Sequence, residues 1–146
     1  MQAMTLSKQE KQTCDNVRKF FKTDFERYSQ LAELADLKSI RYDGTPSADN
    51  VNHQENKMIT TFYYKNIVET VKGIISRMHN ECYRDLIKYR HLEHLSYSQI
   101  AQRMNYGEST VKIKINQAYL LFAEMLALVT DIDLRGGKEN ENKEDD

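Results

Sequence analysis

The chain has 146 residues, 40% of them hydrophobic, and a formal net charge of −1. This length predicts one domain or two small ones, and so small a net charge neither indicates nor excludes a nucleic-acid partner. The two cysteines lack CxxC spacing, which indicates reduced thiols rather than a disulfide framework. The first residues lack the apolar core of a signal peptide, and no segment has the roughly 18 apolar residues of a membrane span. We therefore expect a soluble, cytoplasmic protein without a membrane partner.

The N-terminal part is expected to contain one helix and one loop. Residues 7–39 carry apolar side chains at spacings of three and four, which predicts a helix with one apolar stripe. Its early basic residues are interpreted as a solvated face rather than as a contact to DNA or to polymerase. Residues 40–53 hold the only proline and the sequence Asp43-Gly44-Thr45-Pro46, which predicts a plain loop. The stripe consists of Val17, Phe21, Phe25, Tyr28, Leu31 and Leu34.

The middle of the chain, residues 54–79, predicts a second helix. Its apolar residues lie on more than one face, a pattern typical of a helix that is central in the fold or that forms an oligomer interface. We expect the central position, because the flanking helices each need a partner for their apolar stripes. The main stripe consists of Ile59, Tyr63, Ile67, Val71, Ile74 and Met78, and the side chains that widen it are Phe62, Tyr64, Val68 and Ile75.

The C-terminal part contains a pattern of helix, tight turn and helix. Ser96 can cap the first helix, since its side-chain oxygen can accept a hydrogen bond from a free amide. Ala101 provides the small side chain that two steeply crossing helices require at their closest approach. Asn105 follows at the position where a helix end often turns left-handed. Tyr106 is expected to be an apolar plug, and Gly107 a weak cap for the next helix. These signals together predict a helix-turn-helix.

The second helix of this motif, from Glu108 onward, predicts a DNA-reading surface. Val111, Ile115, Ala118 and Phe122 recur at spacings of four and three and would face the core. The remaining positions near the helix start are small, polar or basic, as a reader of the major groove requires. A plain helical hairpin with a solvated charged face is the less favoured alternative. The predicted DNA-binding residues are Ser109, Thr110, Lys112, Ile113, Lys114, Asn116 and Gln117.

The segment SYSQIAQRMNYGESTVKIKINQA resembles the S-x-x-E-I-A-x-x-L-G-I-S-x-x-T-V-K run of sigma-factor region four and related regulators. The chain as a whole resembles the ArpU-type transcriptional regulators of phages and prophages of low-GC Gram-positive bacteria. That resemblance covers most of residues 15–128 and implies control of late genes such as packaging or lysis genes. Three positions depart from the pattern: Gln99 replaces the usual Glu, Asn105 the usual Gly, and Gly107 the usual capping Ser.

The sequence shows no pattern typical of an enzyme. His91 and His94 are three residues apart, but no third ligand is evident, so a surface histidine pair is favoured over a metal site. Residues 131–146 carry seven acidic and three basic residues, which predicts a solvated, disordered tail. No catalytic residue, cofactor or metal is therefore predicted.

We expect an all-α protein that acts as a sequence-specific DNA-binding transcription regulator. Double-stranded DNA is the predicted partner, with RNA polymerase and a second copy of the chain as further candidates. Two alternatives stay open: a sigma-like factor that recruits RNA polymerase, and a small phage packaging or scaffolding subunit. The expected parts are an N-terminal helix and loop (1–53), a central helix (54–79), a helix-turn-helix unit (80–130) and an acidic tail (131–146).

Overall fold

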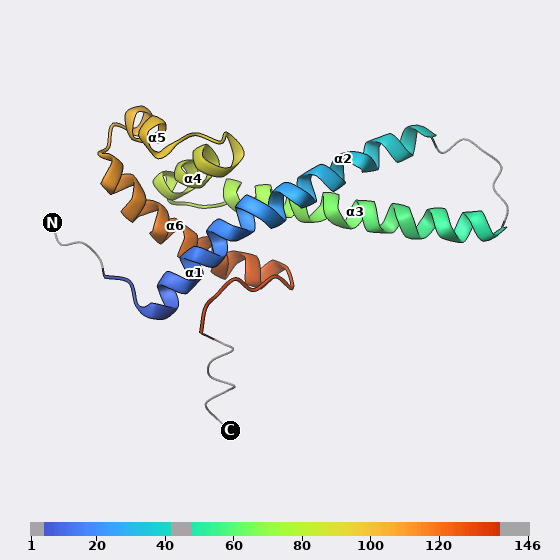
Figure 1. Ribbon diagram of the computed structural model, residues 1–146, viewed down its shortest axis with the longest axis horizontal. Helices are drawn as coiled ribbons and strands as arrows, with labels where there is room; N and C mark the ends of the chain where they lie inside the picture. Colours follow the sequence, from blue (N-terminus) through green and yellow to red (C-terminus); the bar gives the residue numbers. More distant parts are fainter. Residues whose placement is uncertain (1–4, 42–47, 138–146) are drawn as a thin grey trace, which may run out of the picture.

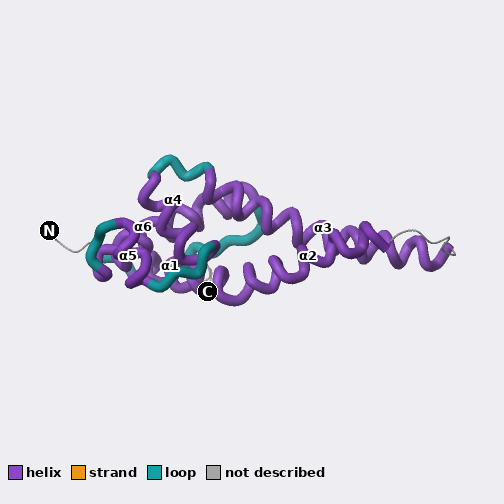
Figure 2. The backbone as a smooth tube through the Cα atoms, turned by 90° about the horizontal axis from the view of Figure 1, so that it is seen from above, coloured by secondary structure: helices purple, strands orange, loops and turns teal. Residues whose placement is uncertain are grey.

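The computed structural model describes residues 5–41 and 48–137, and in these residues all regular secondary structure is helical. The chain forms a compact helical end and a long two-helix arm that extends from it (Figures 1 and 2). The all-α fold with a C-terminal helix-turn-helix is thereby confirmed. The elements are α1 (Lys8–Lys19), the π-helical turn η1 (Phe20–Asp24), α2 (Phe25–Arg41), α3 (Ala48–Ser76), α4 (Glu81–Ile87), the π-helical turn η2 (Lys88–Leu92), α5 (Tyr97–Met104) and α6 (Glu108–Val129).

The first three elements form one continuous long helix (Figure 1). It begins with a capping box, in which Ser7 Oγ accepts from the backbone amide of Glu10, and the Glu10 carboxylate accepts from the amide of Ser7. The π-helical turn then lets the neighbouring Phe20 and Phe21 both enter the core together with Phe25. A regular α-helix would rotate one of two adjacent side chains away from the core, so the wider turn brings an additional aromatic ring inside.

The arm consists of α2 and α3, which run antiparallel in contact with each other (Figure 1). Among the described side chains of α2 in this region, the buried ones are the small Ala32 and Ala35, whereas the expected stripe residue Leu34 is exposed. The extra residue of the π-helical turn shifts the helical register, which explains why the predicted stripe is wrong at this point.

The apolar stripe of α3 divides into two parts. From Ile67 to Met78 it is buried in the core as expected, but Ile59 is 67% exposed, and Phe62 and Tyr63 are also exposed. The central position was therefore predicted correctly only for the second half of the helix. The first half lies in the arm, where α2 is its neighbour and cannot cover two faces.

The loop predicted for residues 40–53 is shorter in the structure. Helix α2 continues to Arg41 and α3 already begins at Ala48, six residues before the expected start, and it ends at Ser76. The Asp and Asn residues at positions 49, 50 and 52 suggested a loop, but such residues are also favourable in the first turns of a helix. The sequence Asp43-Gly44-Thr45-Pro46 lies outside the described residues.

The core lies where α6 crosses α1 and packs against α3, α4 and α5. No helix in the described part of the chain is long and apolar enough to cross a membrane. Each of these helices contributes to the largest fully buried side chains, as do η1 and the turn after α3. These side chains are Val17, Phe20, Val71, Met78, Leu86, Ile87, Ile100, Val111, Ile115, Tyr119, Phe122 and Leu126.

Residues 131–137 are not part of a solvated tail, which corrects the predicted boundary at residue 131. Ile132 and Leu134 pack against the core, and Asn16 Nδ2 donates a hydrogen bond of 2.9 Å to the carbonyl of Leu134. The amide of Gly136 donates to Thr13 Oγ1 at 2.8 Å. This segment, which we call the C-terminal strap, therefore ties the end of α6 to α1. Residues 138–146 lie outside the described part.

Two truncations should separate the strap from the residues beyond it. A chain that ends at residue 137 should keep the full free energy of unfolding, since the removed segment consists only of polar and charged residues. A chain that ends at residue 130 also loses two partly buried aliphatic side chains, which should cost about 2 kcal/mol. Urea unfolding followed by circular dichroism measures both values. Equal stability of the two truncated chains would show that the strap contributes nothing to folding.

Candidate nucleic-acid interface

The helix-turn-helix begins with the supporting helix α4, which is capped by Asn80: its side chain accepts from the amide of Tyr83 at 3.1 Å. Helix α5 starts with a second capping box, between Ser96 and Gln99. The Gln side chain accepts from the amide of Ser96 at 2.9 Å, so this departure from the usual Glu preserves the cap.

The turn of the motif has the predicted backbone. Asn105 adopts the left-handed conformation with φ 61° and ψ 42°, and the amide of Tyr106 donates to the carbonyl of Ala101 at 2.9 Å. Ala101 is 8% exposed at the packing of α5 against α6. Gly107 has an ordinary extended backbone and gives no side-chain cap to α6. Tyr106 is not an apolar plug, because it is 37% exposed and its hydroxyl lies 3.7 Å from Cys82 Sγ.

The N-terminal half of α6 presents one exposed face beside its buried stripe. Val111, Ile115, Ala118 and Phe122 are buried as predicted. Because successive residues rotate by about 100° around an α-helix, Ser109 and Ile113 lie together on the opposite side. Ser109 is exposed and Ile113 is 42% exposed. This centre line of the face carries no charge.

The two lysines lie on opposite edges of this face, since two residues correspond to a rotation of about 200°. Lys112 Nζ lies 5.6 Å from the centroid of the Tyr97 ring and 3.8 Å from a carboxylate oxygen of Glu108. On the other edge, Lys114 Nζ lies 5.6 Å from the centroid of the Tyr106 ring. The Lys112–Glu108 pair is exposed and long, so it holds the ammonium group only weakly. Both cations are thus positioned over aromatic rings and remain available to phosphates.

The other predicted residues are divided between two environments. Thr110 and Gln117 are partly exposed beside the central face. Asn116, in contrast, faces α1: its Oδ1 accepts from Arg18 Nη2, and its backbone carbonyl accepts from Cys14 Sγ at 3.4 Å. The structure therefore gives the Asn116 side chain a role in joining α6 to α1.

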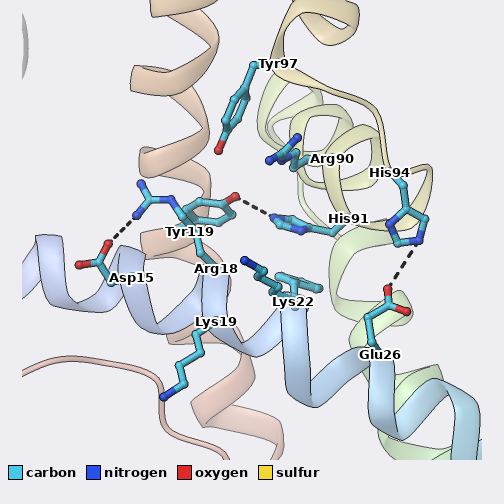
Figure 3. A pocket seen from close by; sticks show the side chains of 11 residues that line it. Asp15, Arg18, Lys19, Lys22, Glu26, Arg90, His91, His94, Tyr97 and Tyr119 are labelled. Carbon is cyan, nitrogen blue, oxygen red and sulfur yellow. Dashed lines mark hydrogen bonds and ion pairs between the residues drawn. The ribbon is translucent and has the colours of Figure 1, made fainter.

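A pocket of about 860 Å³ opens next to Asn116, between α1–η1, η2 and α6 (Figure 3). The spacing of the basic residues of α1 predicts only a solvated face, and the pocket could not be found from spacing because its residues come from distant segments. Its wall combines four cations and two acids with aromatic rings and two histidines. The lining residues are Asp15, Arg18, Lys19, Phe21, Lys22, Glu26, Arg90, His91, His94, Tyr97 and Tyr119.

His91 forms part of the pocket wall and is not the surface residue that was predicted. Its ring stacks on Phe21 at 4.3 Å between centroids, and its Nε2 shares a hydrogen bond of 2.7 Å with the Tyr119 hydroxyl. Burial lowers the pKa of His91 to about 3, and the nearby Arg90, His94 and Arg18 lower it further. Burial also raises the pKa of Tyr119. Both groups are therefore neutral at physiological pH.

His94 lies 3.6 Å from Glu26 rather than joining His91 in a metal site, and the described residues contain no cluster of three metal ligands.

The fold and this surface define an all-α protein with a DNA-binding helix-turn-helix at its C-terminal end. Residues 80–121 match the family Sigma-70, region 4. The matched segment starts at the N-terminal cap of α4 and ends within α6, so it covers the whole motif. The motif is accordingly similar to region four of sigma factors, which is a DNA-binding and not an enzymatic domain. Searches of curated proteins and of solved structures found no match.

Proposed function

We propose that this protein is a sequence-specific DNA-binding transcription regulator whose helix α6 enters the major groove with its N-terminal half. In this mechanism the centre line of the exposed face reads base edges. Ser109 forms hydrogen bonds and Ile113 contacts thymine methyl groups, and Thr110, beside this line, forms a further hydrogen bond. Lys112 and Lys114 bind phosphates of the two strands that border the groove.

The observation that carries this proposal is the arrangement of charge on α6. An uncharged centre with one cation on each edge matches the major groove, in which base edges lie between two phosphate backbones. Solvation of the helix face alone would not require an exposed isoleucine with one cation on each side of it, whereas binding in the major groove uses both features. The match to Sigma-70, region 4 supports the same function for the segment that contains these residues.

Substitution of the two lysines tests the proposal. Lys112→Ala and Lys114→Ala should each weaken binding to duplex DNA without unfolding the protein. A lysine that contacts only phosphate should lower the log–log salt slope by about one unit for an operator and a scrambled duplex alike. A lysine that reads a base should instead cost about 1–3 kcal/mol at one operator position. Binding titrations at several salt concentrations, against an operator selected from a random pool, measure both quantities.

Two controls make the result specific. Lys72→Ala removes the same charge from an exposed position of α3 and should leave the salt slope unchanged. Thr110→Ala removes no charge, so it should change the sequence preference and not the salt dependence. If the Lys112→Ala, Lys114→Ala double variant binds both duplexes like the unchanged protein, α6 does not read DNA.

The resemblance to ArpU-type regulators supports a narrower role, the control of phage or prophage late genes in the host cytoplasm. The family match equally supports a sigma-like factor that recruits RNA polymerase. Co-purification with core polymerase together with promoter melting would favour the sigma-like factor. Operator binding without either activity would favour the regulator.

The arm supports a second candidate function, in which copies of the chain assemble through their arms as in a packaging or scaffolding subunit. Among the side chains of the arm that the structure describes, five large apolar ones are exposed, more than a two-helix hairpin can cover by itself. Light scattering should then show a closed oligomer that Ile59→Ser and Phe62→Ser dissociate. A monomer at all concentrations would contradict this function. The five exposed residues are Leu34, Leu37, Ile59, Phe62 and Tyr63.

A further inference from the structure

The pocket beside α6 has an excess of positive charge that its own acids do not neutralise. Asp15 is bound to Arg18 at 2.6 Å, and Glu26 lies against His94. Among the described residues, Lys22 has no ion pair, and it lines the pocket together with Arg90. Figure 3 shows Arg18, Lys22 and Arg90, from three different elements, around the neutral Tyr119–His91 pair.

This pocket is continuous with the Lys112 edge of α6, the helix that we propose reads the DNA. The Arg90 guanidinium stacks on the Tyr97 ring at 4.1 Å, and Lys112 Nζ lies against the same ring at 5.6 Å. On α6, residues 112, 116 and 119 follow one another at i, i+4 and i+7, so they form one line along the helix. Asn116 in the middle of this line holds Arg18, and Tyr119 at its end forms the pocket wall.

The distances fit one DNA strand. Seven residues of α-helix span about 10 Å, so the pocket lies about 10 Å up the helix from Lys112. The major groove is about 12 Å wide and 8.5 Å deep. When the start of α6 reaches the base edges, the part of the helix two turns further along is therefore level with the phosphates at the rim. On the Lys112 side, that position is occupied by the basic pocket.

We propose that this pocket is a second phosphate-binding site for DNA, in which Lys22 and Arg90 hold the backbone of the strand next to Lys112. The N-terminal long helix thereby becomes part of the DNA-binding surface, and the Arg18–Asn116 hydrogen bond fixes its position relative to the recognition helix. The inference rests on the proposed function and extends it to Lys22 and the N-terminal long helix, which lie outside the segment that matches Sigma-70, region 4.

The test compares Lys22→Ala and the charge reversal Lys22→Glu with the control Lys72→Ala. Lys22 is exposed, so neither variant should change the melting temperature by more than a degree or two. Lys22→Ala should lower the salt slope by about one unit for every duplex, and combination with Lys112→Ala should lower it by about two. Ethylation interference gives a direct readout: a phosphate on one strand whose neutralisation weakens the unchanged protein should have no effect on Lys22→Ala.

The other outcomes separate this proposal from the proposed function. If Lys112→Ala lowers the salt slope but both Lys22 variants behave like Lys72→Ala, the second site is refuted and the DNA-reading role of α6 stands. If no duplex binds at all, the proposed function fails as well. Inorganic phosphate, followed by tyrosine fluorescence, tests the other source of the same ligand chemistry. Phosphate binding that Lys22→Ala abolishes, together with an unchanged salt slope on DNA, would show a site for a small phosphorylated molecule and overturn the assignment to DNA.

Discussion

Val111→Asp should unfold the helix-turn-helix unit. Val111 is completely buried between α5 and α6, and a carboxylate there would have no partner. A buried charge without a partner costs about 3–5 kcal/mol, which is a large part of the 5–15 kcal/mol that stabilises a typical domain. We therefore expect a much lower urea midpoint by circular dichroism and the loss of DNA binding at room temperature.

Ile113→Asp is the matched control for this substitution. It introduces the same carboxylate two residues away on the same helix, but at a position that is exposed to solvent. Stability should change by about 0.5 kcal/mol or less. DNA binding should nevertheless be weakened, because a negative charge would lie in the centre of the recognition face. Equal stability of the two variants would show that α6 is rotated differently from its position in this structure.

The helix-turn-helix could be predicted from the sequence because its determinants are local. Ser96 caps α5 through a residue three positions away, and Asn105 turns left-handed within its own backbone. The spacing of Val111 and Ile115 identifies the buried side of α6 without reference to the rest of the chain. The same locality explains why the departure at Gln99 has no structural consequence: only the position of its side-chain oxygen matters for the cap.

The remaining features depend on contacts between distant segments. The π-helical turn changes which residues of α2 are buried, and it is stabilised by the packing of Phe20 and Phe21 against α6 rather than by local preference. In the sequence, the exposed apolar residues of the arm have the same spacing as buried core residues. This spacing does not show whether another part of the protein covers them. The strap is held by hydrogen bonds from Asn16 and to Thr13, more than 100 residues away, and no sequence pattern records such contacts.

The free energy of unfolding should depend strongly on the protonation of His91. Its pKa is 6.5 in an ordinary environment and about 3 in the folded protein. As the pH falls below 6.5, the unfolded chain therefore binds a proton that the folded chain rejects, and stability is lost progressively until the pH approaches 3. Between pH 7 and pH 4 this group alone should cost about 3 kcal/mol.

The variant His91→Gln isolates this effect from the protonation of carboxylates, which both proteins share. The amide cannot titrate, but it also cannot stack on Phe21 as an aromatic ring does. We expect the variant to be less stable at pH 7 and to lose about 3 kcal/mol less than the unchanged protein on acidification to pH 4. Urea unfolding at half-unit pH intervals measures the two slopes. Parallel pH profiles would mean that His91 is charged or solvated in the folded protein. The His91–Tyr119 pair would then not form a neutral wall of the pocket. A steeper profile for the unchanged protein would show instead that His91 is neutral in the folded protein and adds no positive charge to this pocket.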